Sequence, residues 1–131
     1  MNTEKNDNIS KRIQRSLGDP DSTNFLIDRA CNPDQDSRDF LMRLCEEISK
    51  VTDIPTRDRI KGILINRVYG NEVLRENLVS VSEKLKSLNT HIADPTDTEI
   101  NNFSKHSLTL HIVQDVLDRV ERIEEQSGYK I

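Results

Sequence analysis

The sequence predicts an all-α protein, a single-domain bundle of about five to six helices with a long C-terminal helix. Apolar residues recur at spacings of three and four along most of the 131 residues, which is the period of an amphipathic helix. Strand signals are absent from the sequence, since no Asn-Gly or Asp-Gly turn separates alternating apolar runs. Aromatic residues make up only 4% of the chain, so Leu, Ile and Val must form the core.

Two short helices are predicted near the N-terminus. Ile9, Ile13 and Leu17 are spaced by four, and Gly18-Asp19-Pro20 ends the helix that they define. Ser22 or Thr23 can cap a second helix over residues 24–31. We expect residues 1–20 to form either a short helix or a partly disordered arm, and residues 21–131 to form the bundle.

Two longer helices are predicted in the middle of the chain. Ser37 opens the first, and its apolar residues follow helical spacing to about Val51. The second begins at residues 52–55, where Thr52 or Asp53 can act as the cap and Pro55 is tolerated in the first turn. Gly70 supplies a left-handed C-terminal cap for it.

The next predicted helix has one narrow apolar face. Asn71 can cap it, and its apolar residues fall within an arc of roughly 80° at helical periodicity. These residues are Leu74, Leu78, Val81, Leu85 and Leu88. One face of this helix is therefore expected to be buried.

The last predicted helix has a much wider apolar face. A Thr96-x-x-Glu99 capping box can start it, and it can run to about Gln126. Residues 108–113 show a period of two that also fits a strand, but the spacing that follows them is helical. From Leu108 to Ile123 the apolar residues cover an arc of roughly 200°. This helix is therefore either the central helix of the bundle or keeps part of its apolar surface for another chain.

We expect one side of this wide arc to bind another protein or a second copy of the chain. The side lies away from Leu110, Val113 and Leu117, which would face the core. The predicted partner-binding residues are Leu108, Ile112, Val116 and Ile123.

The sequence contains no motif that is typical of an enzyme, a metal site or a cofactor site. His106 and His111 are five residues apart, which places their side chains about 140° from each other around a helix, so they do not share a face that could hold a metal. His91 lies farther away in the sequence. HExxH and Cys-x-x-Cys motifs are missing, and the four glycines are too scattered for a phosphate-binding loop. Cys31 and Cys45 are predicted to be reduced thiols that act as small apolar residues. We expect no enzyme activity, no metal and no cofactor.

The charge distribution argues against nucleic acid as a partner. The chain has 19 basic and 23 acidic residues and a net charge of -4, whereas nucleic-acid binding favours a basic excess. The middle of the chain is the most basic part, with 7 basic and 6 acidic residues over 51–95. Arg57, Lys61 and Arg67 can form a patch that binds a phosphate or an anionic lipid headgroup, although an ordinary solvated face is the alternative.

The sequence predicts an intracellular, cytoplasmic protein. Its longest apolar run is three or four residues, against the roughly 20 that a membrane-spanning helix needs. The polar segment Met1–Asp7 shows no secretory signal.

Residues 25–89 resemble the front half of a VHS or ENTH domain, the helical superhelix of endosomal and clathrin adaptors. The resemblance lies in residues 26–33 (LIDRACNP), residues 44–48 (LCEEI) and residues 67–71 (RVYGN) before a Leu-rich helix. They are similar to the end of the family's first helix, its second helix and the junction of its third and fourth helices. Arg38 or Phe40 stands where the family has a tryptophan that helps some members to bind ubiquitin, so no binding residue is carried over.

These observations favour a non-enzymatic helical protein–protein interaction module, as an adaptor or a subunit of an assembly. The resemblance implies a role in trafficking. A peripheral membrane module that binds phosphoinositides and a self-associating structural protein are the alternatives.

Overall fold

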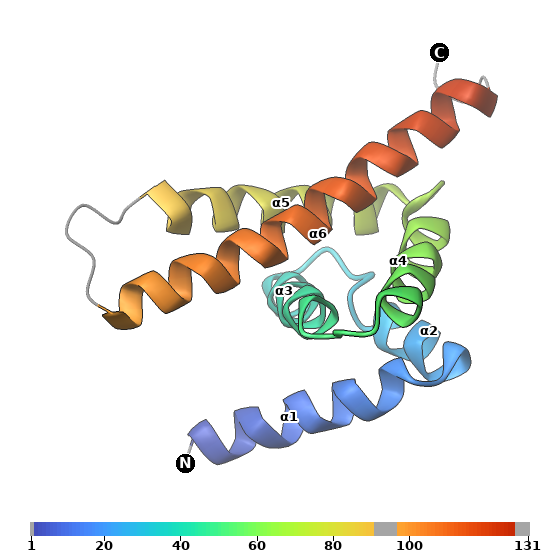
Figure 1. Ribbon diagram of the computed structural model, residues 1–131. Helices are drawn as coiled ribbons and strands as arrows, with labels where there is room; N and C mark the ends of the chain where they lie inside the picture. Colours follow the sequence, from blue (N-terminus) through green and yellow to red (C-terminus); the bar gives the residue numbers. More distant parts are fainter. Residues whose placement is uncertain (1, 91–96, 128–131) are drawn as a thin grey trace.

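The chain folds into six helices in a computed structural model, which describes the backbone of residues 2–90 and 97–127 and the side chains of residues 9–88 and 106–126 (Figure 1). The helices are α1 (Asn2–Leu17), α2 (Pro20–Asp28), α3 (Gln35–Ser49), α4 (Ile54–Val68), α5 (Glu72–Thr90) and α6 (Asp97–Ser127). These ranges contain no strand, and residues 108–113 are helical. The predicted all-α bundle with a long C-terminal helix is confirmed.

An aspartate caps the N-terminus of each of α2, α3 and α4. The carboxylates of Asp19, Asp34 and Asp53 accept the backbone N–H groups of Ser22, Ser37 and Thr56 at 3.0, 2.7 and 3.1 Å. A carboxylate satisfies an unpaired N–H group and also interacts favourably with the positive end of the helix. Of the two predicted caps of α4, Thr52 and Asp53, the structure therefore confirms Asp53.

The predicted starts of α2 and α3 are wrong. Each proposed serine cap lies inside the first turn, where its N–H group donates to an aspartate three residues earlier. The hydroxyl of Thr23, the other proposed cap, is buried and donates to the carbonyls of Ser16 and Asp19. Helix α2 therefore starts at Pro20 and ends at Asp28, earlier than the predicted residues 24–31.

The turn between α4 and α5 follows the predicted pattern. Gly70 has a φ of 77°, the left-handed conformation that favours glycine. The side-chain oxygen of Asn71 accepts the N–H group of Leu74 at 3.0 Å and so caps α5. The cap Thr96 proposed for α6 lies outside the described residues.

Helix α6 packs against three other helices, which accounts for its wide apolar arc. It contacts α3, α4 and α5, and it runs beside α5 in the opposite direction (Figure 1). The buried side chains of α6 include Ile112, Val113, Val116 and Val120. The central-helix alternative therefore explains most of the arc.

Helix α1 closes the other side of the bundle, where it packs on α2 and α3 (Figure 1). Ile13 and Leu17 are 1% and 2% exposed and belong to the same core as the buried residues of α3 to α6. Residues 1–20 therefore include a helix that shares its core with residues 21–131.

Candidate functional site

A pocket of about 350 Å³ opens between α1, α2 and α3. Its lining combines four apolar side chains with three arginines and one serine. These residues are Ile9, Ile13, Leu26 and Phe40, then Arg12, Arg15 and Arg29, and Ser16. Among the described residues, no carboxylate lines the pocket. Its volume lies at the lower end of the roughly 300–1,000 Å³ that is usual for ligand sites.

Helical spacing on α1 places apolar and basic side chains on one face. Residues 9 and 13 are four apart, as are residues 12 and 16, and the two pairs are offset by three residues, so all four share one side of the helix. Ile13 is buried in the core, whereas Arg12 and Arg15 are exposed. Helix α1 therefore contributes both part of the apolar wall and two of the three cations.

Arg29 is held at the pocket by an aromatic ring. It follows the last residue of α2, and its Cζ lies 4.4 Å from the centroid of the Phe40 ring on α3. At an exposed site such a cation–π contact contributes only about 0.5–1 kcal/mol. Its main effect is to orient the guanidinium, whose N–H groups can still donate to a ligand.

The exposed side chains of the three pocket arginines are available to a ligand. Within the described residues, the side chains of Arg12, Arg15 and Arg29 form no ion pair. Three like charges around one opening create a local positive potential that attracts an anion. A guanidinium is also well suited to carboxylate or phosphate, since it donates two parallel hydrogen bonds.

An exposed phenylalanine extends this surface along α2. Phe25 is 73% exposed, the highest value among the large hydrophobic side chains described as exposed. It precedes Leu26 and lies one helical turn before Arg29, both of which line the pocket. The pocket and Phe25 together offer an apolar surface with a basic rim, which we call the α1–α3 face.

The structure does not bring Arg57, Lys61 and Arg67 together as an open anion-binding patch. Lys61 is 7% exposed, and its ammonium lies 2.6 Å from the carboxylate of Asp115 on α6. Arg57 and Arg67 are both partly buried. The prediction failed because sequence spacing shows which cations share a helix but not which carboxylates they meet.

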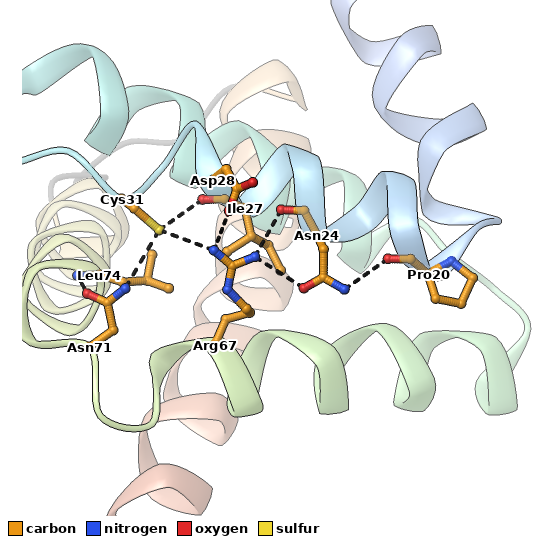
Figure 2. A network of polar contacts seen from close by, with 8 residues as sticks. All are labelled: Pro20, Asn24, Ile27, Asp28, Cys31, Arg67, Asn71 and Leu74. Atoms are coloured by element: carbon orange, nitrogen blue, oxygen red, sulfur yellow. Dashed lines mark hydrogen bonds and ion pairs between the residues drawn. The ribbon is translucent and has the colours of Figure 1, made fainter.

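Arg67 instead connects α4 to α2 (Figure 2). Its Nη1 donates to the backbone carbonyl and to the side-chain oxygen of Asn24, both at 3.1 Å. Its Nη2 pairs with the carboxylate of Asp28 and lies 3.9 Å from Sγ of Cys31 (Figure 2). Nδ2 of Asn71 is 3.8 Å from the same sulfur, so this network ties α2 to the α4–α5 turn.

The four predicted partner-binding residues divide into two groups. Ile112 and Val116 are 2% and 0% exposed and belong to the core. Leu108 and Ile123 are 46% and 37% exposed, so only these two offer apolar surface. The predicted single contact face on α6 is therefore corrected to two exposed residues.

The described titratable side chains give no support for catalysis or metal binding. Burial, with a smaller effect of Glu46, raises the pKa of Cys45 to about 12, so this thiol is not a nucleophile at neutral pH. Both cysteines are free. His111 is exposed and His106 half-buried, and among the described residues no group of His, Cys, Asp and Glu could hold a metal. His91 lies outside the described residues.

Membrane insertion of a helix is not supported in the part of the chain that the structure describes, where no helix combines the required length and apolarity.

Comparison with protein families, with curated proteins and with solved structures found no match.

The arginines of this face were not singled out from the sequence. Charge counted by segment hides them, since residues 1–50 carry 8 basic and 10 acidic side chains. The feature of the sequence that points to these arginines is local, since Arg12 and Arg15 lie beside the apolar positions of α1. The approach of Arg29 and Phe40 to these residues depends on the packing of three helices.

Proposed function

We propose that this chain is a non-enzymatic helical module that binds another protein, and that the α1–α3 face receives an acidic segment of that partner. The observation that carries the proposal is that Arg12, Arg15 and Arg29 line one pocket together with four apolar side chains and form no ion pair with any described residue. Such a combination of apolar surface and unpaired cations suits a peptide with apolar and acidic side chains.

A protein partner fits this face better than a membrane surface. The chain has a net charge of -4, so a flat anionic bilayer is repelled by the molecule as a whole. A pocket, by contrast, places its cations around one protruding group. Two of the three residues that motivated the phosphoinositide hypothesis, Lys61 and Arg67, are engaged in interhelical contacts.

An adaptor role is the cellular function that we propose for this module. It is motivated by the resemblance of residues 25–89 to VHS or ENTH domains. Self-association through Leu108 and Ile123 is the second candidate, because these two side chains are exposed on α6.

Affinity purification from the native cell tests the proposal with two charge-matched variants. The first carries Arg12→Glu and Arg29→Glu in the pocket. The control carries Lys86→Glu and Arg122→Glu, which are exposed on α5 and α6 and do not line the pocket. Proteins that copurify with the wild type and the control but not with the pocket variant support the proposal.

Two results would contradict the proposal. If both variants retain the same partners, or both lose them, the α1–α3 face is not the docking surface. Circular dichroism of both variants shows that the comparison concerns folded protein.

A further inference from the structure

The arginines of the α1–α3 face carry more positive charge and more hydrogen-bond donors than one carboxylate can use. Each guanidinium has five N–H donors, and one guanidinium already satisfies both oxygens of a carboxylate in a bidentate pair. Arg12, Arg15 and Arg29 line the same pocket of about 350 Å³, so one ligand group can contact more than one of them. A phosphate monoester has a charge of about -1.5 to -2 and three strong acceptor oxygens, which matches this excess.

We propose that the partner segment is phosphorylated, with a phosphoserine or phosphothreonine beside an apolar side chain. This inference rests on the proposed function, since it specifies the chemistry of the acidic segment that the α1–α3 face binds. The phosphate contacts the arginines, and the apolar side chain fills the pocket between Ile9, Leu26 and Phe40.

The positions of the apolar and charged groups in the pocket determine which part of the peptide each of them contacts. Ile13 is 1% exposed and belongs to the core, whereas the three arginines are exposed. An inserted side chain therefore meets apolar atoms, and the group next to it in the peptide meets the guanidiniums. Phe25, which is 73% exposed on the helix that Arg29 follows, supplies a second apolar contact for a following residue.

Arg29 is the arginine whose geometry is best prepared for phosphate. Its guanidinium is held against the Phe40 ring at 4.4 Å, so less rotamer freedom is lost when it binds. Lysine at this position keeps the charge but loses the planar donor pair. Arg29→Lys therefore separates bidentate recognition from simple charge attraction.

Short peptides from degenerate libraries test the inference by fluorescence anisotropy at constant ionic strength. Each library fixes one central residue as phosphoserine, phosphothreonine, glutamate or serine, with Phe or Leu beside it. We expect the phosphorylated libraries to bind roughly tenfold more tightly than the glutamate library, because hydrogen bonds between charged groups are among the strongest. Arg29→Ala should abolish this preference, Arg29→Lys should weaken it, and Arg122→Ala should leave it unchanged.

The alternative outcomes distinguish the two proposals. Equal binding of glutamate and phosphorylated libraries overturns the phosphate requirement but leaves the acidic-segment function standing. Absence of binding to every library overturns the phosphopeptide inference, and the affinity purification with pocket variants then decides the proposed function independently. Binding to vesicles of phosphatidylcholine with phosphatidylinositol phosphate, lost in Arg29→Ala while no peptide binds, assigns the pocket to a lipid headgroup and also overturns the inference.

Discussion

The ammonium of Lys61 lies 2.6 Å from the carboxylate of Asp115 and joins α4 to α6. The Lys61 side chain is 9% exposed and that of Asp115 is 26% exposed. Burial acts to raise the pKa of Asp115, but the hydrogen bond and charge of Lys61, with the charges of Arg119 and His111, hold this pKa below its usual value. The ionised pair is therefore part of the packing between the two helices.

Lys61→Met should lower the free energy of unfolding by about 1–3 kcal/mol at neutral pH, because Asp115 loses its hydrogen-bonded cation in a partly buried site. A carboxylate with a lowered folded-state pKa stabilises the protein above its unfolded pKa, near 3.8, and this contribution disappears as the pH falls through the folded pKa. The difference between wild type and variant in urea denaturation should therefore shrink below pH 3.8.

Arg119→Ala is the matched control for this pair. Its Nε lies 3.4 Å from Asp115, and its side chain is 48% exposed, so its loss should have a smaller effect than the loss of Lys61. A Lys61→Met effect that is equally large in acid would show that the lysine stabilises the bundle through packing rather than charge.

Two glycines should respond to alanine with opposite signs. Gly70 has a φ of 77°, where an L-residue is strained, whereas Gly62 lies within helix α4. A Cβ atom at either position meets nothing within 4 Å. Gly70→Ala should lower the free energy of unfolding by about 1–2 kcal/mol, and Gly62→Ala should raise it by about 0.5–1 kcal/mol.

Thermal or urea denaturation of the two glycine variants measures both effects in one experiment. Since neither substitution creates a close contact, the backbone conformation alone determines the difference. Stabilisation by Gly70→Ala would contradict the left-handed turn between α4 and α5.

The α4–α5 turn and the helix caps also show what the sequence reveals about the fold. Gly70, Asn71 and Asp53 act within three or four residues of their own position, so their roles could be predicted from local signals. Ser22 and Ser37 misled the prediction because a serine and an aspartate three residues before it can both cap a helix, and the sequence does not decide between them.

Interactions between distant helices could not be predicted in the same way. The contact of Arg67 with Asn24 and Asp28, like that of Lys61 with Asp115, depends on how whole helices pack. The wide apolar arc of α6 was recognised from periodicity, but its division into core and surface depends on its contacts with α3, α4 and α5. The pocket arginines were missed for the same reason.

Asn77 should be a strong determinant of stability because it joins α5 to the segment after α2. Its side chain is 2% exposed, and Nδ2 donates to the carbonyls of Ala30 and Asn32 at 2.8 and 2.9 Å. Asn77→Leu leaves both carbonyls without this donor and should lower the free energy of unfolding by about 2–3 kcal/mol.

The exposed Asn66 on α4 provides the control for Asn77. Asn66→Leu should change the free energy of unfolding by less than about 0.5 kcal/mol in the same urea titration. Equal effects of the two substitutions would mean that the buried amide makes no specific contribution.

The three aspartate caps should make the bundle sensitive to acid. Hydrogen bonds from Ser22, Ser37 and Thr56 lower the pKa values of Asp19, Asp34 and Asp53 from 3.8. Their stabilising contribution is therefore complete above pH 3.8 and is lost as the pH falls through the lowered values. The melting temperature of the wild type should fall more steeply in this range than that of a variant with asparagine at all three positions.

This comparison works because asparagine caps a helix without titrating. The triple variant keeps the hydrogen-bond acceptor and loses only the charge. Parallel melting curves for the two proteins across the acid range would assign acid sensitivity to other carboxylates, such as Asp115.

Leu108 and Ile112 lie one turn apart on α6 and should differ sharply in their tolerance of charge. Ile112 is 2% exposed and belongs to the core, so Ile112→Ala should lower the free energy of unfolding by about 2–5 kcal/mol and Ile112→Asp should prevent folding. Leu108 is 46% exposed, and Leu108→Asp should leave the melting temperature of the monomer nearly unchanged. Light scattering at two protein concentrations completes the test, because a wild-type dimer that Leu108→Asp dissociates would support self-association through α6. A folded Ile112→Asp variant would instead contradict the packing of α6 at the centre of the bundle.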